Sequence, residues 1–205
     1  MARLQQSPFQ AFAAALAGLF LLGGCATTRT IDTWKDPAFG GPAFKKVMVI
    51  GVSKSDANRR VYEDGFVRAL QAAGSNGSVS YHALPESGAV SNERVNDAAA
   101  KTGSDAVLVT RVLRVARNVD VRPGYAAPGF YGAGFRGWYG GTWATIPPEV
   151  SQYDVLTIES TLWNMRTDKP VWSGTNEVTD PKSVGAATEE LAKNLVAKMR
   201  ADGVL

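Results

Sequence analysis

The sequence predicts a single mixed α/β domain over residues 45–205, with a five-stranded sheet in the element order β-α-β-α-β-β-β-α and covering helices. Two patterns predict this class. Short β-branched runs alternate with helical segments, and two strand-like segments joined by a turn then precede a last helix. Strand–helix–strand units favour parallel strands, whereas the directly joined pair favours an antiparallel hairpin. The length of 205 residues suits one domain, and 45% hydrophobic residues argue against a disordered chain.

The first strand and the first helix are predicted at residues 45–53 and 57–73. The strand is a short aliphatic run rich in valine, which is typical of a buried strand. Asp56 is the expected N-cap of the helix, and Gly74 is expected to end it. The helix should bury an apolar stripe, which consists of Val61, Phe66, Ala69, Leu70 and Ala73.

A second strand is predicted at residues 78–84 and a short helix at 92–102, capped by Ser91 and ended by Gly103. A long strand follows at residues 105–119. Its first half is apolar on both faces, so it should lie in the centre of the sheet. Its second half should project past the core or form a basic ledge, because it carries Arg111, Arg114 and Arg117.

Residues 151–165 and 170–179 are predicted to form the hairpin, with Pro170 at a strand start where a missing N–H is tolerated. The edge of this hairpin is a candidate acceptor for a strand from a partner protein. Asp180 and Pro181 then open the last helix, since proline is favoured in the first turn. The expected core stripe of that helix is Val184, Leu191, Leu195 and Met199.

Residues 1–24 are predicted to be a secretory signal peptide, with a polar start and an apolar run at residues 9–22. That run would span only about 21 Å as a helix, short of a hydrocarbon core of about 30 Å. The alternative, a helix that stays in the membrane, is therefore less favoured.

The sequence Leu22-Gly23-Gly24-Cys25 follows this apolar run and resembles the lipobox of bacterial lipoproteins. We expect cleavage between Gly24 and Cys25 and attachment of diacylglycerol to the Cys25 thiol, with palmitate-type chains holding the protein on the membrane. Ala26 follows, where aspartate often signals retention in the inner membrane, so the outer membrane is the expected location, facing the periplasm. The alternative is a free or buried cysteine after an ordinary export signal. Residues 25–44 are expected to form a lipid-anchored tether, with a short strand near Ile31–Trp34.

Residues 123–148 form an insertion loop that differs from the rest of the chain in composition. Its twenty-six residues include seven glycines, four prolines and seven aromatic residues, with Arg136 as its only charge. The candidate interaction residues are Tyr125, Phe130, Tyr131, Phe135, Trp138, Tyr139 and Trp143. The loop is either a spacer whose rings pack on the domain edge, a protein-binding loop, or a contact for glycan or a membrane surface. Basic residues do not interleave with the rings, which argues against nucleic acid.

The usual signatures of catalysis and metal binding are missing. One Cys and one His exclude a structural zinc site and a disulfide framework, and no cofactor or metal is expected. His82 lacks the partners of a catalytic triad. Glu63 and Asp64 are adjacent on a predicted helix, so their side chains point about 100° apart and are expected on a solvated face. The net charge of +3 is too small to predict binding to nucleic acid.

From Lys46 onward the chain resembles a family of uncharacterised bacterial envelope lipoproteins. The resemblance rests on four segments: residues 46–52 (KVMVIGV), 60–64 (RVYED), 103–110 (GSDAVLVT), and the hairpin from Tyr153-Asp154-Val155 to Pro170-Val171-Trp172-Ser173-Gly174. It implies a fold similar to the amino-terminal domain of TolB and to lipoproteins of the curli-secretion (CsgG) and penicillin-binding-protein-activator (LpoB) type, which act through protein contacts. Two departures are the absence of a TolB-like propeller and of a clear ten-residue alternation for a transmembrane hairpin.

The sequence therefore predicts a non-enzymatic lipoprotein of the bacterial cell envelope that binds an unidentified envelope protein or maintains the envelope. The alternatives are a subunit of a ring-forming secretion or pore assembly, a glycan-binding module, and an envelope enzyme. An enzyme would need a convergent polar pocket, which the sequence does not indicate.

Overall fold

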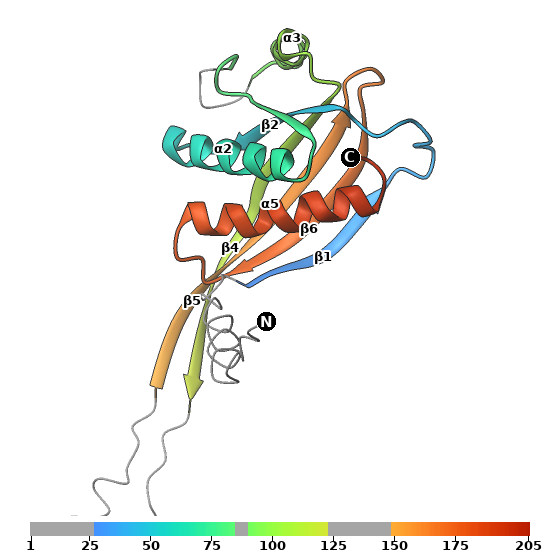
Figure 1. Ribbon diagram of the computed structural model, residues 1–205. Helices are drawn as coiled ribbons and strands as arrows, with labels where there is room; N and C mark the ends of the chain where they lie inside the picture. The colour runs from blue at the N-terminus through green and yellow to red at the C-terminus, as the bar shows by residue number, and fades with distance from the viewer. Residues whose placement is uncertain (1–26, 85–89, 123–148) are drawn as a thin grey trace, which may run out of the picture.

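The computed structural model describes residues 27–84, 90–122 and 149–205, and these form one mixed sheet with helices on both of its faces (Figure 1). The strands are β1 (Thr27–Lys35), β2 (Lys46–Val52), β3 (Asn76–Val79), β4 (Ala106–Arg122), β5 (Glu149–Asn164) and β6 (Lys169–Thr179). The helices in the described part are α2 (Asp56–Ala72), α3 (Asn92–Thr102) and α5 (Val184–Ala201).

The sheet has six strands in the order β1-β6-β5-β4-β2-β3. The predicted parallel trio is confirmed, because β2 pairs in parallel with both β3 and β4. The antiparallel β5–β6 hairpin is also confirmed, and it turns at Asp168, whose φ of 53° is left-handed. The predicted number of five strands is wrong. The sixth strand is β1, which pairs antiparallel with β6 and occupies residues of the expected tether.

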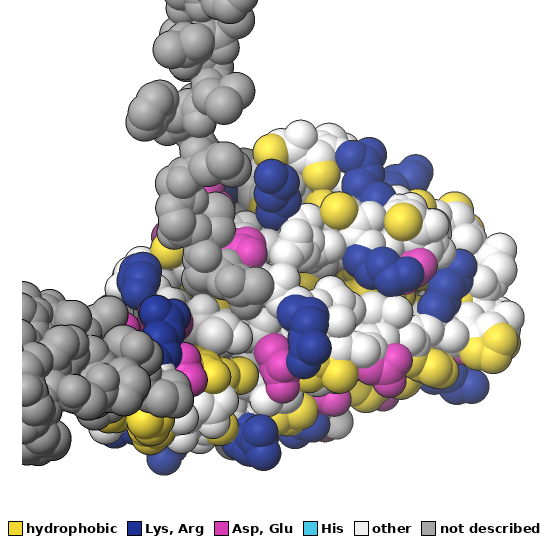
Figure 2. All heavy atoms as spheres, turned by 90° about the horizontal axis from the view of Figure 1, so that it is seen from below, with side chains coloured by type: hydrophobic (Ala, Val, Ile, Leu, Met, Phe, Trp, Pro, Cys, Tyr) yellow, Lys and Arg dark blue, Asp and Glu magenta, His cyan; other side chains and the backbone are white. Residues whose placement is uncertain are grey.

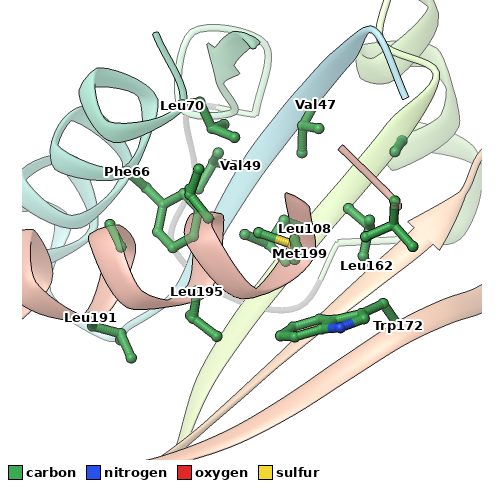
Figure 3. Packing of buried hydrophobic residues seen from close by; sticks show 14 of the residues in the cluster. Val47, Val49, Phe66, Leu70, Leu108, Leu162, Trp172, Leu191, Leu195 and Met199 are labelled. Atoms are coloured by element: carbon green, nitrogen blue, oxygen red, sulfur yellow. The ribbon is translucent and has the colours of Figure 1, made fainter. Parts of the chain in front are cut away.

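The hydrophobic core lies between the sheet and the helices α2 and α5, which cross one face side by side (Figure 1). Successive residues of a strand point to opposite faces, so Val47 and Val49 join this core while Met48 joins a smaller cluster under α3 on the other face. The main cluster is centred on Phe66, Leu70, Leu108, Leu162, Trp172, Leu191, Leu195 and Met199 (Figure 3).

Serine residues cap all three described helices, through side-chain oxygens that accept a hydrogen bond from a backbone N–H of the first turn. For α3 the predicted bounds, the Ser91 cap and the left-handed Gly103 are confirmed. The cap of α2 is Ser55 and not Asp56, and α5 begins after Ser183 and not at Pro181. Two valines of the predicted stripes, Val61 and Val184, are both 41% exposed and are not among the buried core residues.

Strand β3 is shorter than the predicted strand at residues 78–84. It begins at Asn76 and ends at Val79, where the next two backbone N–H groups donate to a side chain, and the N–H of Ser80 also donates to Val49 O of β2 at 3.1 Å. Ser80 N and Tyr81 N both bond Glu63 Oε2, at 2.6 and 3.1 Å. His82 then lies exposed in a turn.

Candidate interaction surface

Strands β4 and β5 continue past the rest of the sheet as a two-stranded ribbon (Figure 1). At one end of the sheet, β1 begins and β6 ends in the same row of paired residues, which consists of Thr27, Thr179, Val155 and Ala116. Beyond that row only β4 and β5 remain, paired as far as Arg122 and Glu149. The predicted projection of the second half of this long strand is therefore confirmed.

A β-bulge between Val112 and Arg114 determines which side chains share a face of this ribbon. Without the bulge, Arg111 and Arg117 would lie on the same face, because they are six residues apart. With it, Arg111 pairs with Glu159 on the face away from α2 and α5, while Arg117 pairs with Asp154 on the helix-bearing face. The arginines of the second half do not form a continuous basic ledge.

The helix-bearing face of the ribbon carries exposed valines beside Gln152 and the Arg117–Asp154 ion pair. Val115, Val119 and Val121 alternate along β4, and Val150 is the cross-strand partner of Val121. These four valines are 56–61% exposed. The opposite face carries polar residues, among them Asn118, Asp120, Arg122, Ser151 and Tyr153. Sequence reasoning missed this surface, although the alternation of valine with polar residues over residues 115–122 was the available signal.

A hollow of about 240 Å³ lies at the base of the ribbon, lined by Arg117, Gln152, Tyr153, Asp154, Asp180 and Pro181. Its charged groups are paired with one another or with neighbours. Arg117 Nε lies 3.1 Å from Asp154 Oδ1, and Lys182 Nζ lies 2.5 Å from Asp180 Oδ2. Each of the two carboxylates of the hollow therefore has a cationic partner.

Charge on the visible surface is mixed in sign. In the view of Figure 2, Lys and Arg side chains alternate with Asp and Glu side chains and with apolar patches. On the face of the sheet away from α2 and α5, Arg111 is paired with Glu159 and Arg29 with Glu177, each at 2.7 Å.

The hairpin edge is not free to accept a partner strand, contrary to the prediction. The chain's own strand β1 pairs along β6 from Thr27 to Lys35, so the edge of the sheet is β1 itself. A bulge between Thr30 and Asp32 interrupts the pairing, and Ile31 and Trp34 of this strand are 49% and 45% exposed. Bulges of this kind disfavour pairing with another chain at an edge.

Glu63 is fully buried, which contradicts its expected place on a solvated helix face. Oε1 accepts from Gly51 N (3.2 Å), Arg59 Nε (2.9 Å) and Ser80 Oγ (2.7 Å). Oε2 accepts from two further backbone N–H groups at the end of β3. Five donors hold the carboxylate, so it ties α2 to β2 and β3 as a structural group. Asp64 points elsewhere and accepts from Tyr81 Oη at 2.8 Å.

A second polar contact inside the core joins α2 to the sheet. Tyr62 Oη donates to Thr110 Oγ1 at 2.7 Å, and that hydroxyl is 2.7 Å from Ser160 Oγ. Burial raises the pKa of the Tyr62 phenol above its ordinary value, so Tyr62 stays protonated as a donor. The contact fastens the helix over the central strands.

The other predicted site residues lie outside the described residues. These are the lipidation site Cys25 with Gly24, and the loop residues Tyr125, Phe130, Tyr131, Phe135, Trp138, Tyr139 and Trp143. The loop joins the two strands of the ribbon at Arg122 and Glu149, whose side chains approach to 3.6 Å. Within residues 27–84, 90–122 and 149–205, no helix has the length and apolar character to cross a bilayer. In the same ranges, no group of His, Cys, Asp and Glu side chains is arranged to hold a metal ion.

Fold and surface together define a mixed α/β sheet domain with a projecting two-stranded ribbon. No protein-family model matches the chain, and no curated protein sequence matches it. Solved structures with a similar arrangement include the PelC dodecamer from Paraburkholderia phytofirmans, with 15% identity, a TM-score of 0.43, and coverage of 84% of this chain and 94% of that chain. Lipoprotein GNA1162 from Neisseria meningitidis also has 15% identity, with a TM-score of 0.41 and coverage of 78% and 99%. These likenesses assign neither family nor function, and the predicted relation to TolB, CsgG and LpoB stays a prediction.

Proposed function

We propose that this protein is a non-enzymatic lipoprotein of the bacterial envelope that presents a protein-interaction surface to the periplasm. The observation that carries the proposal is the lipobox-like sequence Leu22-Gly23-Gly24-Cys25 directly after the apolar run of residues 9–22. The proposed relation to envelope lipoproteins of the TolB, CsgG and LpoB type agrees with such a role. The proposed location is the periplasmic face of the outer membrane.

Acylation would hold the protein on the membrane without a spanning helix. Each buried methylene group contributes about 0.8 kcal/mol, and two or more chains give a stable anchor where a single chain gives a marginal one. The lone cysteine of the sequence is thereby accounted for. The anchor would also be short, because strand β1 begins at Thr27, two residues after Cys25.

An interaction role is supported by the contrast between the interior and the ribbon. The buried Glu63 carboxylate is saturated by donors, and the charged groups of the hollow at the base of the ribbon are paired. The ribbon, by comparison, exposes four valines and carries the aromatic-rich residues 123–148 at its end. Exposed aromatic and aliphatic side chains are the usual anchors of protein contacts.

The Cys25→Ser variant tests the anchor. We expect the wild-type protein to sediment with membranes and to require detergent for release, whereas the variant should be in the soluble periplasmic fraction, because serine offers no thiol for acylation. Cell fractionation with immunoblotting measures this. Ala26→Asp is the matched control: it keeps the lipobox and should move the protein to the inner membrane in an enterobacterial host. A Cys25→Ser protein that still needs detergent for release would refute lipid anchoring.

Deletion of residues 123–148 tests the interaction role. In-cell crosslinking with mass spectrometry should give specific crosslinks to an envelope protein for the wild type, and these should be lost on deletion. A loop of equal length with its seven aromatic residues changed to serine separates loss of the rings from shortening of the connection. A crosslink pattern unchanged in both variants would count against the loop as the interaction site.

A further inference from the structure

We infer that the valine-bearing face of the β4–β5 ribbon, formed by Val119, Val121 and Val150 with Val115 at its base, enters the interface of the bilayer to which Cys25 is anchored. This inference rests on the proposed lipidation of Cys25. The occupant of this face is thus the acyl-chain layer of the protein's own membrane.

The first argument is that the anchor and the ribbon lie at the same end of the sheet. Strand β1 starts at Thr27, opposite Thr179, and runs away from the ribbon toward Lys35. Cys25 precedes Thr27 by two residues, and extended chain covers about 3.4 Å per residue. The acylated residue therefore lies within roughly 7 Å of the start of β1. Figure 1 shows the ribbon leaving the sheet at the end where β1 begins.

The second argument is the distance by which the ribbon extends beyond the start of β1. Thr27 belongs to the row that ends at Ala116 of β4, and the ribbon continues from there to Arg122. Six further residues of strand add about 20 Å at a rise of about 3.4 Å each. A ribbon of that length, which starts within one short step of the lipid anchor, reaches the membrane surface and lies along it, with its valine-bearing face toward the acyl chains and its polar face toward water.

The third argument is the chemistry of the two ribbon faces. The four valines are 56–61% exposed on one face, where water would cover them in the absence of a lipid or protein partner. Gln152, Arg117 and Asp154 lie on the same face, and Arg117 is paired with Asp154 at 3.1 Å. The outermost cross-strand pair on this face, Val121 with Val150, is apolar. The opposite face carries Asn118, Asp120 and Arg122, which suit water and headgroups. Exposed apolar side chains on one face and polar side chains on the other are the arrangement that an interfacial segment needs.

The closeness of the ribbon to the anchor also favours lipid over a second copy of the chain as the occupant. Acylation would hold the base of the ribbon close to the bilayer. Nothing in the described residues holds the ribbon close to a second copy of the chain. Contact with a second copy is therefore treated as the competing outcome of the test.

The test uses single-cysteine labelling of the full-length, acylated protein in vesicles of phosphatidylethanolamine and phosphatidylglycerol. Because Cys25 is the only cysteine of the sequence and its thiol would be acylated, a new cysteine takes the label alone. The labelled variants are Val119→Cys and Val121→Cys on the valine-bearing face and Asn118→Cys on the polar face. Thr167→Cys, in the exposed β5–β6 turn at the far end of the sheet, is the aqueous control.

We expect a polarity-sensitive NBD label at positions 119 and 121 to shift its emission to the blue and to lose most of its intensity when the vesicles contain doxyl-labelled lipid. The label at 118 should be quenched less, and the label at 167 should keep the emission seen in water. Quenching at 119 and 121 no greater than at 167 would overturn the inference. A blue shift without quenching by lipid would also overturn it, since the valines would then face protein.

Labelling of the parent protein, which has no added cysteine, distinguishes failure of the membrane-contact inference from failure of the proposed lipid anchor. An acylated parent takes no thiol label. Labelling of Cys25 in the parent would refute the anchor, whereas an unlabelled parent with an aqueous ribbon would refute only the membrane contact of the valines.

Discussion

Replacing Glu63 with alanine should lower the free energy of unfolding by about 3–5 kcal/mol, the cost of removing one partner from a buried ion pair. The truncation leaves the Arg59 guanidinium, only 5% exposed as a residue, without the carboxylate at 2.9 Å. It also removes an acceptor of the backbone N–H groups of Gly51 and Tyr81 and one of the two acceptors of Ser80 N, which also donates to Val49 O. Unsatisfied buried donors each cost on the order of 1–3 kcal/mol, and relaxation with entry of water offsets part of the sum. For a domain stable by about 5–15 kcal/mol, this loss is a large fraction.

Urea unfolding followed by far-ultraviolet circular dichroism, in the soluble Cys25→Ser background, measures the effect. Glu189→Ala is the matched control, because Glu189 is exposed on α5 and its loss should change stability by no more than about 0.5 kcal/mol. Glu63→Gln keeps the volume and one acceptor oxygen, so it should fall between the two. A Glu63→Ala cost equal to that of Glu189→Ala would show that the carboxylate does not hold α2 to the sheet.

The burial of Glu63 could have been predicted from its position in the sequence. It precedes Phe66 by three residues and Leu70 by seven, which places it on the buried stripe of α2. Treating the carboxylate as solvated was wrong because a charge is buried only where donors gather around it, and those donors come from β2 and from the end of β3. Contacts between elements distant in sequence were the missing information.

The predictable features of the fold are those that local chemistry determines. The Ser91 cap and Gly103, whose φ of 66° is left-handed, fixed the ends of α3, and the valine-rich runs fixed the central strands. Strand β1 was expected only as a short strand near Ile31–Trp34. Its threonine-rich sequence has no apolar alternation, and pairing with β6 is what makes it a strand.

The candidate interaction surface was likewise predictable only in part. Arginines in the second half of the long strand predicted that it would project from the core, and this is confirmed. The bulge between Val112 and Arg114 was not predictable, because a single extra residue leaves no signature in composition. It nevertheless determines that Val115, Val119 and Val121 share the helix-bearing face with Arg117.

Replacing Gly174 with alanine should destabilise the domain by about 1–3 kcal/mol, the usual cost of overpacking a core. A Cβ atom on Gly174 would lie 2.5 Å from Cη2 and 3.1 Å from Cζ3 of Trp172, and 3.3 Å from Cδ2 of Leu195. Real Cβ atoms do not approach neighbours to 2.5 Å, so the indole ring has to move. Figure 3 shows the ring lying among the core residues.

The indole ring has little freedom to give way. Trp172 is fully buried, and its Nε1 donates to Asp202 Oδ2 at 2.8 Å. Lys198 Nζ holds the other oxygen of that carboxylate at 2.9 Å. Burial of Asp202 opposes its ionisation, but these two hydrogen bonds outweigh it and lower the pKa of the carboxyl. The acceptor therefore stays charged at neutral pH, and displacing the ring weakens a charge-assisted hydrogen bond in addition to the packing.

A double-mutant cycle with Trp172→Leu distinguishes this clash from a general intolerance of side chains at position 174. Leucine lacks the Cη2 and Cζ3 atoms that a Cβ would meet, so Gly174→Ala should cost much less in the Trp172→Leu background. The expected coupling is about 1 kcal/mol or more, in the range for residues in direct contact. Strictly additive costs in urea unfolding would mean that the strand backbone, and not the ring, excludes a side chain at position 174. Coupling would show that Trp172 and Gly174, two residues apart in the segment on which the family resemblance rests, form one packing unit under α5.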